Sequence, residues 1–139
     1  MTTPATPTTP DAPATAGGLR TALLVLAWLV PLGILTQAAL AGQALFVDGA
    51  LFGLHGGVGH GVLTLTLILG VLIVVAGAGR LPLALVVLLF VGLIGQTGLG
   101  YVGHRGGTAV ASSLHVPLGV TLLGLAVALA TVLARPGRR

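Results

Sequence analysis

The sequence predicts an all-α membrane protein in which four transmembrane helices form an up-down bundle. Of its 139 residues, 55% are apolar and 6% are charged, whereas about a quarter of the residues in a soluble domain are charged. The mean hydropathy is +1.13. No segment alternates as the strands of a membrane barrel do. Four uncharged stretches each exceed the ~20 residues that a helix needs to cross the hydrocarbon; they are Thr21–Val47, Gly49–Gly79, Leu81–Gly103 and Gly106–Ala134.

The chain divides into a tail, a membrane domain and a short basic end. Residues 1–18 are rich in Thr, Pro and Ala and hold four of the eight prolines, a composition typical of disorder. A single transmembrane domain is expected over 19–135, followed by a cytoplasmic tail over 136–139. Within that domain, helices are expected at about 20–42, 52–77, 82–102 and 111–134.

Arginine positions predict the orientation. Arg105 lies on one side of the predicted membrane, and the other five arginines lie on the opposite side: Arg20, Arg80, Arg135, Arg138 and Arg139. The arginine-rich side is expected to be cytoplasmic, so both ends of this multi-pass cell-membrane protein should face inward. The arginines form no basic stripe, which argues against nucleic acid as a partner. There is no cysteine, which excludes disulfides and thiolate metal sites.

The histidines and glutamines gather in the outer half of the predicted bundle. Histidine within a span is costly and normally faces the bundle interior with a partner, so those in or near spans are the informative residues. His104 is expected in a solvated outer loop beside Arg105. The simpler interpretation of the others is a place at the interface or in interhelical hydrogen bonds. The set comprises His55, His60, His104 and His115, with Gln37, Gln43 and Gln96.

An internal repeat distinguishes two of these histidines. Gln37 is followed after eighteen residues by His55, within Leu-His-x-x-x-Gly. Gln96 is followed after nineteen residues by His115, within the same pattern. Glutamine and histidine are rare in this chain, so their matching order is informative. Two similar hairpins in one orientation would give a bundle with a pseudo-twofold axis along the membrane normal.

Each repeated histidine has a glycine one helical turn away. Gly59 shares a helical face with His55, and Gly119 shares one with His115. We expect these glycines to leave space for a flat ligand between two facing histidines. Two imidazoles suit the axial positions of a haem iron, and such ligation favours electron transfer. The alternative for the glycines is close helix packing, because Gly53, Gly57 and Gly61 form a small-xxx-small pattern.

His60 is the alternative ligand on the second helix. It lies roughly 140° around the helix from His55, so both cannot bind one iron without distortion. Counting from Arg80 and Arg135 gives His60 and His115 the same depth, whereas the repeat pairs His55 with His115. We favour the repeat, because tilt and ragged helix ends blur depth.

The same motifs resemble known families. The stretch from Gln96 to Tyr101, followed by Leu114-His115, is similar to the third and fourth helices of one half of haem A synthase. The chain also resembles a family of small bacterial four-helix membrane proteins over about residues 20–134. That pattern reads Gln37, Ala41-Gly42, Phe46, His55, Gly59, Gln96 and Leu114-His115. The first resemblance implies that histidines on the second and fourth helices serve haem.

The leading function prediction is a haem b–binding membrane protein for electron transfer or haem handling. His55 and His115 would be the axial ligands, with Gln37 and Gln96 as polar wall or propionate neighbours. Tyr101 and Arg105 would be further propionate partners. Its partners would be a membrane redox protein or further copies of itself.

The alternative is a non-catalytic membrane subunit or scaffold whose histidines and glutamines make interhelical hydrogen bonds. A proton path is disfavoured because no charge lies within a span. Enzymatic hydrolysis is disfavoured too, because no carboxylate accompanies a histidine within a span. A metal site of His55, His104 and His115 remains open.

Overall fold

The computed structural model describes residues 14–135, which form four helices joined by short turns. All four are long and apolar enough to cross a membrane. The predicted all-α, four-helix membrane bundle is therefore confirmed. The helices are α1 (Ala14–Phe46), α2 (Leu51–Val75), α3 (Arg80–Gly106) and α4 (Ala109–Ala134).

Two helix bounds differ from the sequence prediction in ways that matter. α1 begins at Ala14, so residues 14–18, expected in the disordered tail, are helical. α3 continues to Gly106 rather than ending near 102, which places His104 on a helix instead of in a loop. The predicted tails at 1–13 and 136–139 lie outside the described residues.

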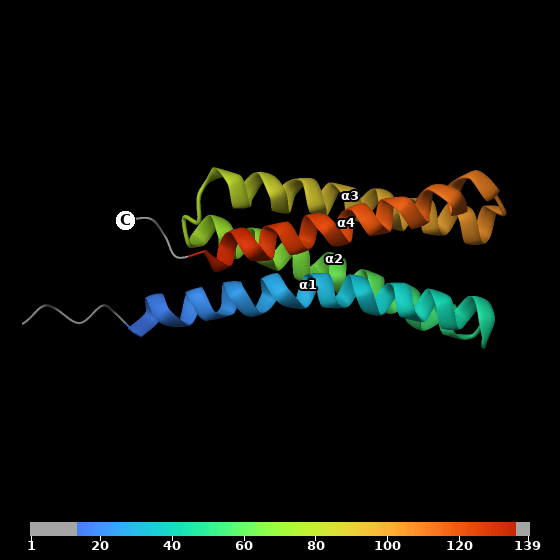
Figure 1. Cartoon of the computed structure of the whole chain (residues 1–139), viewed down its shortest axis with the longest axis horizontal. Coiled ribbons are helices and arrows are strands. Elements are labelled where there is room, and N and C mark those ends of the chain that lie inside the picture. Colours follow the sequence, from blue (N-terminus) through green and yellow to red (C-terminus); the bar gives the residue numbers. More distant parts are fainter. Residues whose placement is uncertain (1–13, 136–139) are drawn as a thin grey trace, which may run out of the picture.

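Two turns lie at one end of the bundle and join α1 to α2 and α3 to α4. Asp48 shapes the first turn, because its Oδ1 accepts a hydrogen bond of 2.9 Å from the backbone N–H of Ala50. The second turn is very short, and Gly107 caps α3 with a left-handed φ of 64° that disfavours side chains. We call the end of the bundle that holds these two turns the hairpin end, and the half of the bundle next to it the hairpin half. The α2–α3 turn and the described chain ends lie at the other end, the termini end (Figure 1).

Each helix packs against two neighbours. Backbone contacts within residues 14–135 join α1 to α2, α3 to α4, α1 to α4, and α2 to α3. In that part of the chain the diagonal pairs, α1 with α3 and α2 with α4, make none. The bundle is therefore four-cornered, and only side chains can meet across its diagonals.

The buried core repeats between the two hairpins. On α1 the core positions recur 59 residues later on α3, and on α2 they recur 60 residues later on α4. The predicted repeat of two hairpins thus extends from the Gln and His motifs into the packing. The first set is Leu23, Ala27, Val30 and Ile34 with Pro82, Val86, Leu89 and Leu93; the second is Val62, Thr66, Leu69 and Ile73 with Leu122, Ala126, Leu129 and the partly buried Leu133.

The core occupies only the half of the bundle next to the termini end, which we call the termini half. It ends at a layer formed by Ile34 and Leu93 with their neighbours on α2 and α4. Between this layer and the hairpin end, the only buried residues of the described chain are Ala44 and Ala111. The half of the bundle nearer the hairpin end therefore has few buried side chains, and the histidines lie there.

Candidate functional site: two glutamine–histidine pairs

The first pair joins α1 to α2. The His55 ring nitrogen Nδ1 donates to the backbone carbonyl of Gln37 over 3.1 Å. In return the Gln37 side-chain amide donates to the backbone carbonyl of His55. The two hydrogen bonds run in opposite directions, so each residue orients the other.

The second pair repeats this arrangement between α3 and α4. The His115 Nδ1 donates to the Gln96 backbone carbonyl over 3.0 Å, and the Gln96 amide donates to the His115 carbonyl over 2.9 Å. One detail differs: Gln96 Oε1 is the buried side-chain polar atom that lacks a hydrogen-bond partner in the described chain. The predicted repeat thus contains matching hydrogen bonds as well as matching sequence.

The carbonyl partners define the protonation of both rings. A carbonyl oxygen can only accept, so Nδ1 of His55 and of His115 must carry the hydrogen. In the neutral imidazole this leaves Nε2 as an unprotonated acceptor. A metal-binding histidine is commonly oriented in this way, with its other ring nitrogen donating to a backbone carbonyl.

The two pairs bring their histidines together across the bundle diagonal. α2 and α4 do not touch through their backbones, yet the ring centres of His55 and His115 are 6.2 Å apart, with their planes inclined by 59°. Both side chains are partly buried. The structure therefore joins the two histidines that the repeat selected.

The other two histidines lie elsewhere. His60 is exposed on α2 and contacts the hydroxyl of Tyr101 on α3. Tyr101 is the residue that the sequence had suggested as a propionate partner. The ring of His104 packs on Phe52, with their centres 4.9 Å apart. Within residues 14–135 no three potential metal ligands gather. The site of His55, His104 and His115 that the sequence left open is therefore not formed there.

The helix bounds also explain why counting depth from arginines was misleading. α2 ends at Val75, five residues before Arg80, because residues 76–79 form the turn. Measured from the helix ends, His55 lies 20 residues before Val75 and His115 lies 19 before Ala134. The two histidines therefore lie at nearly the same distance from the ends of their helices, which removes the conflict with the repeat.

The glycines below the histidines make room for glutamine side chains. A Cβ atom on Gly59 would lie 3.3 Å from Gln37 Oε1, and one on Gly119 would lie 3.0 Å from Gln96 Nε2. The sequence suggested that these glycines leave a shelf for a flat ligand. In the structure that space holds the amides that bind the histidine carbonyls.

Small residues continue the repeat in the hairpin half, a feature that the sequence analysis missed. α1 carries Ala41 and Ala44, and α3 carries Gly100 and Gly103, each 59 residues later. A Cβ on Gly100 would approach His115 Cε1 to 3.1 Å. The signal was present as a continuation of the repeat, but alanine and glycine are too common in this chain to be noticed without the structure.

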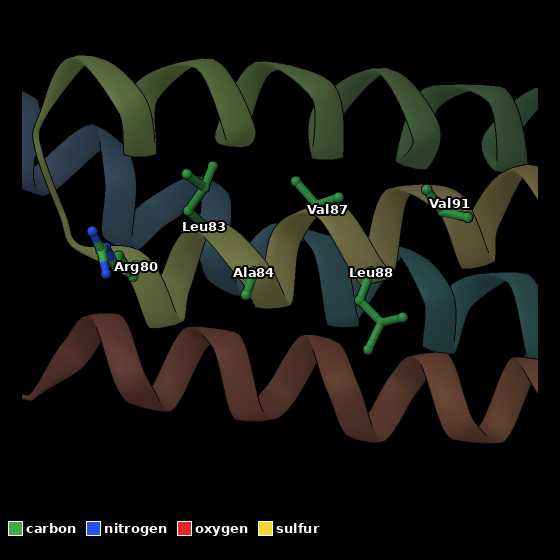
Figure 2. A pocket seen from close by; sticks show the side chains of 6 residues that line it. All are labelled: Arg80, Leu83, Ala84, Val87, Leu88 and Val91. Atoms are coloured by element: carbon green, nitrogen blue, oxygen red, sulfur yellow. The ribbon is translucent and has the colours of Figure 1, made fainter.

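A shallow hollow on α3 lies apart from this site. It is on one face of the helix near the termini end, and its lining is apolar apart from the arginine (Figure 2). It holds no histidine or glutamine, so it has no part in the candidate site. Its lining residues are Arg80, Leu83, Ala84, Val87, Leu88 and Val91.

Comparison with protein-family models, with curated proteins and with solved structures finds no match to this chain. The fold and the site therefore define a class only: a multi-pass, all-α membrane protein with two glutamine–histidine pairs in its hairpin half. The resemblance to haem A synthase stays a prediction.

Proposed function

We propose that this protein binds haem b between His55 and His115 for electron transfer or haem handling in the cell membrane. The observation that carries the proposal is the pair of rings 6.2 Å apart on diagonal helices. A metal ion bound by both imidazoles would separate the ring centres by about 6 Å, since a metal–imidazole bond is about 2 Å and the nitrogen lies about 1 Å from the ring centre. The observed spacing agrees with that value.

The chemistry of the donors supports the same proposal. Each Nδ1 is engaged by a backbone carbonyl, so each Nε2 is the nitrogen left to bind a metal. Two imidazoles complete the coordination of a haem iron, whereas zinc takes three or four protein ligands. With both axial positions filled, the iron would exchange electrons rather than bind oxygen.

The surroundings of the rings support a large ligand over a bare ion. In the termini half, α1 and α3 present Val30, Ile34, Leu89 and Leu93 to the core. In the hairpin half, α3 carries Gly100 beside the His115 ring, where a Cβ would approach His115 Cε1 to 3.1 Å. Bundle cores are a common place for cofactors, and the absence of a large side chain at Gly100 favours a ligand that reaches the His115 ring from α3.

The test is a reduced-minus-oxidised spectrum of protein expressed with haem supply and purified in detergent. We expect a sharp low-spin haem spectrum that disappears in His55→Ala and in His115→Ala. His104→Ala is the matched control, because this exposed histidine packs on Phe52 and should leave the spectrum unchanged. Well-folded protein without haem, or loss of the spectrum only in His60→Ala, would contradict the proposal.

The alternative function is a non-catalytic membrane subunit, and the reciprocal hydrogen bonds favour it. Polar side chains join membrane helices by such bonds, each contributing on average about 0.6 kcal/mol. In this case the pairs would only hold each hairpin together. Added haem that leaves the stability of the purified protein unchanged would favour this alternative, because a ligand that binds only the folded state stabilises it.

A further inference from the structure

The shallow hollow on α3 has a counterpart on α1. Each of its apolar residues, from Leu83 to Val91, lies 59 residues after a residue that lines the hollow on α1. This is the spacing by which the buried core repeats between the same two helices, so the repeat extends to the outer surface of the bundle. The α1 hollow is lined by Leu24, Val25, Trp28, Leu29 and Leu32.

A positive charge distinguishes the two hollows. Arg80 lines the α3 hollow and lies at the start of the helix (Figure 2). The equivalent residue on α1 is Thr21, which does not line the hollow there and whose hydroxyl donates to the Gly17 carbonyl over 3.0 Å. Trp28 also takes the place of Val87, so α1 fills with a large ring the position where α3 has a small side chain. The α3 hollow therefore combines an open apolar surface with a cation.

No carboxylate of the described chain neutralises Arg80. Asp48 is the only acidic residue among residues 14–135, and it lies at the hairpin end, far from Arg80. The Arg80 side chain is exposed. Side chains lean toward the start of their helix, which for α3 is the termini end. The guanidinium is therefore directed toward the membrane surface, the level at which basic residues recognise lipid head groups.

The length of the α3 hollow matches one leaflet of a bilayer. Val91 lies eleven residues after Arg80, which is about 16 Å along a helix axis. Half of the hydrocarbon layer is about 15 Å thick. Leu83 and Val87 border the row toward α2, and Leu88 borders it toward α4 (Figure 2). A chain that starts at Arg80 and follows this row would therefore end near the middle of the membrane.

We propose that the α3 hollow binds one anionic phospholipid, with its phosphate on Arg80 and an acyl chain along the row from Leu83 to Val91. Arginine binds phosphate through two parallel hydrogen bonds, and the apolar row suits a hydrocarbon chain. A zwitterionic head group would bring a second positive charge near Arg80, so a net negative lipid fits better. The site lies outside the half of the bundle that holds His55 and His115 and needs no haem, so it goes beyond the proposed function.

The experiment is native mass spectrometry of the full chain, released from micelles that contain phosphatidylglycerol and phosphatidylcholine in equal amounts. We expect one phosphatidylglycerol to be retained in preference to phosphatidylcholine. Arg80→Gln should reduce this preference about fivefold, which is equivalent to about 1 kcal/mol. Arg20→Gln is the matched control, because it removes the same charge at the same end of the bundle but from outside both hollows. It should retain lipid as the unaltered protein does.

A second pair of variants tests the apolar row while both arginines stay in place. Ala84→Trp should fill the α3 hollow and reduce the retention of phosphatidylglycerol as much as Arg80→Gln does. Val25→Trp makes the equivalent change on α1 and should leave retention unchanged. All of these side chains are exposed, so the variants should fold.

Other outcomes would overturn the inference. Equal losses in Arg80→Gln and Arg20→Gln would mean that the arginines attract anionic lipid only through their summed charge. Unchanged retention in Ala84→Trp, with displacement of the lipid by added inorganic phosphate, would make Arg80 a site for phosphate alone. A dimer that is lost in Ala84→Trp would assign the hollow to a second copy of the chain. Retention of phosphatidylglycerol by a protein that never takes up haem would contradict the proposed function alone.

Discussion

His115 and Gln96 are joined by two hydrogen bonds of opposite direction, and one oxygen between them remains unpaired. The imidazole donates to the glutamine backbone and the glutamine amide donates to the histidine backbone. Gln96 Oε1 is buried without a partner, whereas the Gln37–His55 pair has no such atom among the described residues. The two repeated pairs therefore have the same geometry but different energetic costs.

This difference predicts unequal effects of removing the glutamines. Gln37→Leu deletes one interhelical hydrogen bond and should lower the free energy of unfolding by about 0.6–1 kcal/mol. Gln96→Leu deletes the equivalent bond but also the unpaired buried oxygen, whose desolvation costs about 1–3 kcal/mol. We expect Gln96→Leu to be neutral or stabilising. Unfolding in mixed micelles with increasing sodium dodecyl sulfate measures both, and equal losses would contradict the asymmetry.

The four spans and the nearness of His55 to His115 could be predicted because they depend on strong local signals. Apolar length identifies spans, and the spacing of Gln37 to His55 repeats nearly unchanged between Gln96 and His115. The helix ends could not be placed as well, because a glycine with positive φ such as Gly107 ends a helix only where the tertiary turn requires it.

The contacts that individual side chains make could not be predicted from the sequence. Whether Gly59 faces a ligand or Gln37 depends on rotamers that only the packed hairpin determines. The contact of Phe52 with His104 and that of His60 with Tyr101 join different hairpins. The repeat of Gln and His predicted that His55 and His115 would meet between the hairpins, but the residues of these two contacts lie outside that repeat.

Gly119 provides a second prediction. Gly119→Ala would place a methyl group 3.0 Å from Gln96 Nε2, so the amide must move and its bond to the His115 carbonyl must lengthen. Gly124→Ala on the same helix is the matched control, because its Cβ would meet nothing within 4 Å. We expect the control to gain about 0.5–1 kcal/mol from alanine's helix propensity and Gly119→Ala to show no such gain. Thermal unfolding in one detergent compares them; equal gains would mean that Gln96 adapts freely.

The core contains a closer approach at Gly92 on α3. A Cβ there would lie 2.5 Å from Leu122 Cδ2 on α4, too close without movement of the leucine. Gly92→Ala should therefore destabilise the bundle by about 1–3 kcal/mol, whereas Gly95→Ala, with open space around its Cβ, should not. Because the clash involves one side chain, adding Leu122→Ala should cost less in the Gly92→Ala background than alone. Additive losses in this double-mutant cycle would place the strain elsewhere.

The orientation in the membrane gives a last prediction, and the absence of cysteine makes it clean to measure. The hairpin-end turns contain Asp48 and Thr108, and the turn at the opposite end contains Ala78. Because arginines cluster near the termini end, that end should be cytoplasmic. In intact cells, a membrane-impermeant maleimide should label Asp48→Cys and Thr108→Cys, and should label Ala78→Cys only after permeabilisation. The reverse pattern would move the glutamine–histidine pairs to the cytoplasmic side and contradict the orientation predicted from the arginines. Labelling of all three variants in intact cells would show that the chain inserts in both orientations. This result is expected only if the single Arg105 near the hairpin end offsets the effect of the arginines near the termini end.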